Sequence, residues 1–198
     1  MIEVEKKIVL DIVLLLPSDV RQFCTDLDRG SERSKEVSFE NGYGPHITLS
    51  MRCVKVGDVS EITKKIQELV QNLAALDLTI VGFHEGKFSW LDIAKVDALI
   101  ELHRRVNAIV ESFSSSDAIA SYFYEGNEKA PEQSLINYVN NFSANSCGEN
   151  YAPHISMGTE KAFSPEFPIQ FKADTVGVFQ LGHHGTCKNK IAEFKLHS

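Results

Sequence analysis

The chain has 198 residues, 43% of them hydrophobic, which is enough to bury a core in one domain or in two closely joined lobes. Twenty Lys and Arg residues stand against 27 Asp and Glu residues, so the formal net charge is -7. A negative net charge is unfavourable for a protein that binds long nucleic acid through its phosphates. It does not exclude a small or short anionic ligand.

The first predicted element is the apolar run "IVLDIVLLL" at residues 8–16, which indicates a buried strand that ends at Pro17. A secretion signal is the weaker interpretation, because Asp11 interrupts the run and no A-x-A cleavage site follows it. No other segment approaches the roughly 18 uninterrupted apolar residues that a membrane span needs. The four cysteines form no C-x-x-C pair, which favours reduced thiols in a cytoplasmic protein.

The remaining elements follow from the spacing of apolar residues and from Gly and Pro punctuation. Helices are predicted at residues 18–29, 58–76, 97–113 and 131–142. Strands are predicted at residues 76–86 and 88–96, as a hairpin, and two or three more within residues 169–196. Residues 114–134 are the least patterned part and predict a surface loop. No low-complexity linker divides the chain into independent domains.

One short phrase occurs twice, more than half the chain apart. Residues 43–49 read "YGPHITL" and residues 151–157 read "YAPHISM", identical or chemically similar at all seven positions. A bare His-x-Ser/Thr is weak evidence, since about one such triplet is expected by chance in a chain with seven histidines. The Pro before each His and the Ile after it make an accidental second copy improbable.

Strand geometry predicts which side chains of the phrase share a face, because neighbours alternate with a period of two. The core face of the first copy holds Ile47, Leu49, Met51 and Cys53, and the other face holds His46, Thr48, Ser50 and Arg52. In the second copy, His154 and Ser156 lie opposite Ile155 and Met157. These polar residues are either the solvent-facing side of two half-buried strands or, if the halves pack with approximate two-fold symmetry, two histidines across one groove.

A pair of histidines in one groove suits the hydrolysis of a phosphodiester. Imidazole titrates near neutral pH, so one ring acts as general base on water while the other, protonated, donates to the leaving oxygen. The hydroxyls of Thr48 and Ser156 would donate hydrogen bonds to the non-bridging phosphoryl oxygens. Neither a metal nor a covalent intermediate is needed for this chemistry.

The two motifs resemble those of the 2H phosphoesterase superfamily, which is named for a pair of widely separated His-x-Ser/Thr motifs. The resemblance covers nearly the whole chain, and "FQLGHHGT" at residues 179–186 is similar to a phrase of bacterial members described as 2′-5′ RNA ligase-like. It implies a bilobal α+β fold with pseudo-two-fold symmetry, in which two antiparallel sheets flank a V-shaped cleft and helices lie outside. Residues 1–198 would form a single domain of two intertwined lobes, with 43–49 in one and 151–157 in the other.

The resemblance also implies a metal-independent phosphodiesterase, of the cyclic phosphodiesterase branch, that acts on a 2′,3′-cyclic phosphate or a 2′-5′ linkage. The catalytic set carried over by position is His46, Thr48, His154 and Ser156, with His154 as base and His46 as acid. Tyr43 and Tyr151 are candidates for stacking a base at the groove rim, or for packing beside the strand ends. Arg52 is a candidate for attracting phosphate. No cofactor and no metal are expected, and a monomer is expected.

The substrate expected from these features is a small nucleotide or a short RNA end, because the first motif has fewer basic neighbours than RNA-acting members often carry. Two alternatives stay open: a nucleotide- or RNA-binding protein that uses the same groove without turnover, and RNA ligation as the reverse reaction. A Ser or Cys hydrolase is disfavoured, because the chain has no G-x-S-x-G elbow.

The other five histidines have weaker interpretations. His183 and His184 could join a metal cluster with the two motif histidines, but a glycine-bounded turn is the better prediction. His103 and His197 are predicted to lie at the surface, and so is His84, for which a place in the groove is the alternative.

Overall fold

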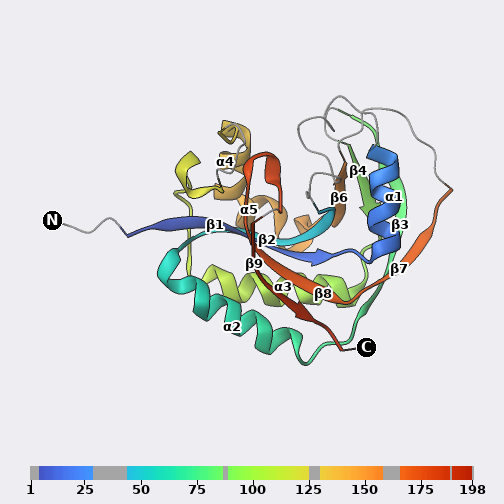
Figure 1. Ribbon diagram of the computed structural model, residues 1–198, viewed down its shortest axis with the longest axis horizontal. Coiled ribbons are helices and arrows are strands. Elements are labelled where there is room, and N and C mark those ends of the chain that lie inside the picture. Colours follow the sequence, from blue (N-terminus) through green and yellow to red (C-terminus); the bar gives the residue numbers. More distant parts are fainter. Residues whose placement is uncertain are drawn as a thin grey trace.

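The computed structural model contains one continuous antiparallel sheet of nine strands (Figure 1). The structure describes residues 5–28, 44–86, 89–124, 130–157, 166–187 and 189–197. The strand order is β7-β3-β4-β6-β2-β1-β8-β9, and the short β5 pairs with β2 off this path. The bounds are β1 Lys7–Leu15, β2 His46–Lys55, β3 Leu76–His84, β4 Ser89–Ile93, β5 Ser114–Ser115, β6 His154–Met157, β7 Ile169–Ala173, β8 Thr175–Gln180 and β9 Asn189–Lys195.

All four predicted helices are present among the described residues, but their ends differ from the predicted ones, and a fifth helix that was not predicted follows the last of them. Their bounds are α1 Ser18–Asp28, α2 Val59–Val70, α3 Asp97–Glu111, α4 Gln133–Asn140 and α5 Phe142–Ser146. The second helix was predicted to run to residue 76 but ends at Val70. The reason lies at the C-terminus: Ala75 N–H donates to the His197 carbonyl, and His197 N–H donates to the Leu73 carbonyl. These long-range bonds replace further helical ones.

The sheet consists of two four-stranded halves, β7-β3-β4-β6 and β2-β1-β8-β9. They join where β2 meets β6, through one antiparallel register pair, Ile47 with Ile155. Each repeated phrase therefore supplies the innermost strand of its half. The predicted α+β fold is confirmed, and the two expected sheets are the two halves of this continuous, curled sheet (Figure 1).

The helices cover the two faces of the sheet unequally. Figure 1 shows α2 and α3 on one side of β1 and β2, and α4 and α5 on the other. The larger core lies beneath α2 and α3 and includes Ile47, Leu49 and Ile155, all fully buried. A smaller core forms where Met51 and Cys53 pack against α4 and α5. We call the face opposite α2 and α3 the site face.

Strand β2 contains a bulge at Leu49. Ile12 of β1 pairs with Ser50 and Val13 pairs with Thr48, so Leu49 stands between them without a partner on β1. The Leu49 carbonyl accepts hydrogen bonds from α3 instead, from His103 Nδ1–H at 2.8 Å and from an Asn107 side-chain N–H at 2.9 Å. An extra residue in a strand shifts the alternation of every side chain after it.

The bulge turns Ser50 and Arg52 away from His46. Ser50 donates to the side-chain oxygen of Asn107 at 2.8 Å, and the Arg52 guanidinium pairs with Glu111 at 3.1 Å, both on α3. The prediction that Ser50 and Arg52 share the face of His46 is therefore wrong. Strict alternation, on which that prediction depended, holds only for the first part of β2.

His103 is also placed differently from the sequence prediction. It was expected at the surface, but only 1% of it is exposed, and its ring stacks on that of Tyr151 with centroids 3.6 Å apart. Burial lowers the pKa of His103 to about 4, although its hydrogen bond to the Leu49 carbonyl acts in the opposite direction. His103 is thus neutral near pH 7, and its hydrogen bond to the Leu49 carbonyl supports the bulge.

Acid should therefore destabilise the fold through His103. The folded pKa of about 4 lies below the ordinary value of 6.5, so between these values the unfolded chain binds a proton that the folded chain does not. The contribution of His103 to the free energy of unfolding is full above pH 6.5 and falls by up to about 3 kcal/mol toward pH 4. Urea unfolding from about pH 7 to about pH 4.5 should show a shallower pH dependence for His103→Gln than for the wild type. The exposed His197→Gln is the control, and equal slopes in all three proteins would contradict the assignment.

Candidate active site

The rings of His46 and His154 are anchored in the same way. Nδ1 of His46 lies 2.8 Å from the carbonyl oxygen of Gly44, and Nδ1 of His154 lies 2.8 Å from that of Ala152. A carbonyl only accepts, so each Nδ1 carries a hydrogen and Nε2 is the unprotonated nitrogen of the neutral ring. The repeated phrase therefore fixes one tautomer twice, through the residue two positions before each histidine.

The strand register brings the four predicted catalytic side chains to the site face. Because Ile47 pairs with Ile155 in an antiparallel ladder, the flanking positions place His46 across from Ser156 and Thr48 across from His154. Burial lowers the pKa of His46 most, and its electrostatic interaction with the neighbouring His154 lowers it further. Each histidine thus has the hydroxyl residue of the other copy beside it.

An aromatic pair borders the His154 side of the site. In register, β4 places Trp90 beside Ser156 and Asp92 beside His154. The Trp90 ring lies 5.8 Å from that of His154, stacks on His84 with centroids 3.8 Å apart, and donates its Nε1–H to Asp92 at 2.8 Å. His84 is exposed as predicted, and the stack places it beside the site. No sequence motif marked Trp90, since a single Trp in a strand is compatible with core packing.

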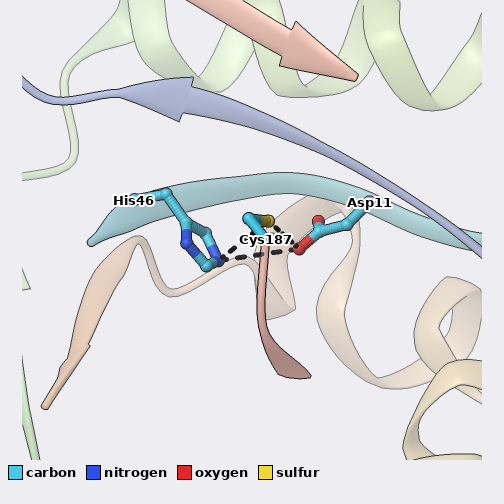
Figure 2. A group of neighbouring side chains, drawn as sticks. All are labelled: Asp11, His46 and Cys187. Carbon is cyan, nitrogen blue, oxygen red and sulfur yellow. Dashed lines mark hydrogen bonds and ion pairs between the residues drawn. The ribbon is translucent and has the colours of Figure 1, made fainter. Parts of the chain in front are cut away.

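A carboxylate and a thiol border the His46 side, as Figure 2 shows. Oδ2 of Asp11 on β1 lies 3.6 Å from Nε2 of His46, and Sγ of Cys187 lies 3.1 Å from the same Asp11 oxygen and 3.7 Å from Nε2. Burial raises the pKa of Asp11 to about 7, although the Cys187 hydrogen bond lowers it. Burial and the neighbouring Asp11 raise the pKa of the Cys187 thiol, so the thiol stays protonated and donates to Asp11. Burial lowers the pKa of His46, partly offset by its bond to the Gly44 carbonyl.

The surface beside Asp11 is formed by Phe179 and Gly177 of β8. Phe179 pairs with Asp11 in register, is 6% exposed, and packs with Val13 and Cys187. Its ring lies over Gly177 so closely that a Cβ at Gly177 would collide with it. Because Gly177 has no side chain, the Phe179 ring can pack against β8 next to the buried Asp11 carboxylate.

Two of the three predicted substrate-binding residues, Tyr151 and Arg52, do not lie beside the histidines. Tyr151 is 4% exposed, stacks on His103, and donates its hydroxyl hydrogen to the Thr48 carbonyl at 3.1 Å, so it packs beneath the strands and does not line a rim. Arg52 is 4% exposed and directed toward α3 by the bulge, away from the site face. Tyr43 lies outside the described residues.

The turn predicted around His183 and His184 is confirmed. Residues His183–Gly185 form a 3-10 turn in which His184 has φ of 63° and Gly185 has φ of 72°. The left-handed conformation at Gly185 suits a residue without a Cβ. His183 is 3% exposed within this turn.

Comparison with solved structures shows the same fold in several other proteins. Escherichia coli LigT complexed with ATP matches with a TM-score of 0.60 and 14% identity, over 98% of this chain and 100% of that chain. TT0787 of Thermus thermophilus matches with a TM-score of 0.60 and 15% identity, over 96% and 98%. A further phosphoesterase structure matches with a TM-score of 0.57 and 14% identity, over 99% and 100%. The chain thus has the fold of these three proteins, in agreement with the fold that the motif resemblance implied.

Sequence comparison adds no closer relative. No protein-family model matches the chain, and no curated protein matches it. Within the described residues, no helix combines the length and the apolar character needed to cross a membrane.

Substituting Gly177 should test how closely Phe179 is packed beside Asp11. In Gly177→Ala the added methyl group must displace a buried ring, so the free energy of unfolding should fall by about 1–3 kcal/mol. Urea denaturation followed by circular dichroism measures this loss. Gly57→Ala is the control, since nothing lies within 4 Å of a Cβ at Gly57. Equal stability of the two variants would show that the Phe179 ring moves freely.

Proposed function

We propose that the protein is a metal-independent phosphodiesterase of the 2H phosphoesterase superfamily, with a 2′,3′-cyclic phosphate or a 2′-5′ phosphodiester as its substrate. The observation that carries this proposal is the pair of identically anchored imidazoles, His46 and His154, on either side of the Ile47–Ile155 contact. Two Nε2 atoms on one face, each beside a hydroxyl residue, supply the groups that a two-histidine mechanism needs.

In the proposed reaction, water attacks phosphorus while one imidazole removes its proton and the other, protonated, donates to the leaving oxygen. The bond between phosphorus and the leaving oxygen breaks, a phosphomonoester and a hydroxyl form, and the two rings have exchanged protonation states. The family resemblance assigns His154 to the base and His46 to the acid. The burial that lowers the pKa of His46 opposes this order, whereas Asp11, where its carboxylate is ionised, supports it, since an anion 3.6 Å from Nε2 stabilises the imidazolium of His46.

Thr48 and Ser156 have the second role in this proposal. Each hydroxyl donates a hydrogen bond to a non-bridging phosphoryl oxygen, where negative charge is held in the transition state. The antiparallel register places each beside the histidine of the other copy. A phosphoryl group held between them would be within reach of both imidazoles.

The proposed substrate class is a small nucleotide or a short RNA end. The net charge of -7 disfavours a long polyanion, and Arg52, the candidate phosphate contact, is paired with Glu111 instead. Structures of E. coli LigT complexed with ATP, NADP+ and 3′-AMP show that a protein of this fold binds such molecules. The Trp90–His84 stack beside His154 is our candidate surface for the base, because bases stack on aromatic rings.

The histidines can be tested directly. In EDTA, His46→Ala and His154→Ala should each lower kcat on a 2′,3′-cyclic nucleotide or a 2′-5′ dinucleotide by about 10²–10⁴, since each removes a proton transfer in the transition state. Product formation is followed by mass spectrometry. His197→Ala, an exposed histidine near the C-terminus, is the matched control and should retain full turnover.

Two results would refute the proposal. Unchanged turnover in either active-site variant would exclude a catalytic role for that histidine. Tight calorimetric binding of these nucleotides without any product would favour the alternative, a nucleotide-binding protein that uses the same face.

A further inference from the structure

Asp11, His46 and Cys187 form the one group of potential metal ligands found in the described part of the chain (Figure 2). Their donor atoms, a carboxylate oxygen, an imidazole nitrogen and a thiol sulfur, all lie within 4.8 Å of one another. They come from β1, from β2 and from the segment before β9, so no sequence spacing relates them. Asp11 is 0% exposed and Cys187 is 4% exposed, while the His46 side chain is 13% exposed.

The separations of the three donor atoms match one face of a zinc coordination tetrahedron. They are 3.1 Å from oxygen to sulfur, 3.6 Å from oxygen to nitrogen and 3.7 Å from sulfur to nitrogen. A triangle with these sides has its centre about 2.0 Å from every corner, and zinc bonds to oxygen, nitrogen and sulfur are roughly 2.0–2.3 Å long. A cation would thus need only a small outward shift from that centre to reach bonding distance from all three atoms.

The electrostatic surroundings of Asp11 favour a cation at this position. Among the described residues no Lys or Arg pairs with this fully buried carboxylate, and its Oδ1 atom has no hydrogen-bond partner there. The ionised form of such a buried carboxyl group carries a large desolvation cost, which a bound cation would offset. The donor set of one thiolate, one imidazole and one carboxylate selects a borderline metal such as Zn²⁺ over Mg²⁺ or Ca²⁺, which prefer oxygen ligands alone.

We propose that Asp11, His46 and Cys187 bind Zn²⁺ and that the bound ion inhibits the enzyme. Metal binding forms bonds to Oδ2 of Asp11, Nε2 of His46 and Sγ of Cys187, and the thiol proton, with that of the carboxyl group where present, passes to solvent. Nε2 of His46 then has no lone pair with which to accept or carry a proton. The inhibition rests on the function proposed above, whereas the metal site does not.

The metal site is tested with Co²⁺ as a spectroscopic probe on the full chain. The wild type should bind one equivalent of Co²⁺ with a thiolate-to-cobalt charge-transfer band, and Zn²⁺ should displace it. Cys187→Ser should lose the band, and Asp11→Asn should bind Zn²⁺ about tenfold or more weakly. Cys147→Ser, which alters a partly buried thiol outside the cluster, is the control and should keep the band. Absence of the band in the wild type would overturn the site, whatever the variants do.

The inhibition is tested by titrating Zn²⁺ against turnover of a 2′,3′-cyclic nucleotide. Activity measured in EDTA should fall as Zn²⁺ saturates the site and return on chelation, and the midpoint should rise about tenfold or more in Cys187→Ser. If Zn²⁺ occupies the site and turnover is unchanged or higher, the inhibitory role is refuted. If no substrate is turned over while the cobalt band forms, the proposed function fails and the metal site stands.

Discussion

The candidate site depends on the antiparallel contact between Ile47 and Ile155. This contact joins the two halves of the sheet and aligns the repeated phrases. Side chains in a ladder alternate between faces, so burying both isoleucines in the core places His46, Thr48, His154 and Ser156 together on the opposite face. A slip of one residue would turn the chemical groups of one copy into the core. The buried apolar pair therefore fixes the register on which the proposed chemistry depends.

The bulge at Leu49 divides β2 into two environments. Before it, His46 and Thr48 occupy the site face, and after it, Ser50 and Arg52 point toward α3. The carbonyl that the bulge leaves without a partner on β1 is satisfied by His103 and Asn107. Because an unpaired buried carbonyl is costly, α3 and the bulge support each other, and the bulge holds the histidine end of β2 in place.

The sequence pattern was sufficient to predict the elements that short stretches of the chain determine. The repeated phrase predicted both motif strands, and apolar spacing predicted α1, α3 and the hairpin of β3 and β4. The same pattern predicted the wrong positions for Arg52 and His103. The bulge in β2 depends on contacts with another strand and with α3, which the local sequence does not contain. The sequence left two interpretations for Tyr151, a residue at the groove rim or one that packs beside the strand ends. Its stacking on His103 shows that it packs.

Asp11 and Cys187 show a second limit of sequence reasoning. Asp11 appeared only as an interruption of an apolar strand, and Cys187 only as one of four scattered thiols. Tertiary folding brings both to His46. A signal was nevertheless present: a single carboxylate in the otherwise apolar run of residues 8–16 needs a partner, because a buried charge is costly. That partner lies far away in sequence, so only the structure identifies it.

The most direct test of the two-histidine account is a double-mutant cycle on turnover in EDTA. If His46 and His154 act in one concerted proton exchange, removing both should cost about as much in kcat as removing either, because one missing partner already disables the step. Losses that multiply in His46→Ala/His154→Ala would show two independent effects and would contradict a shared acid and base mechanism.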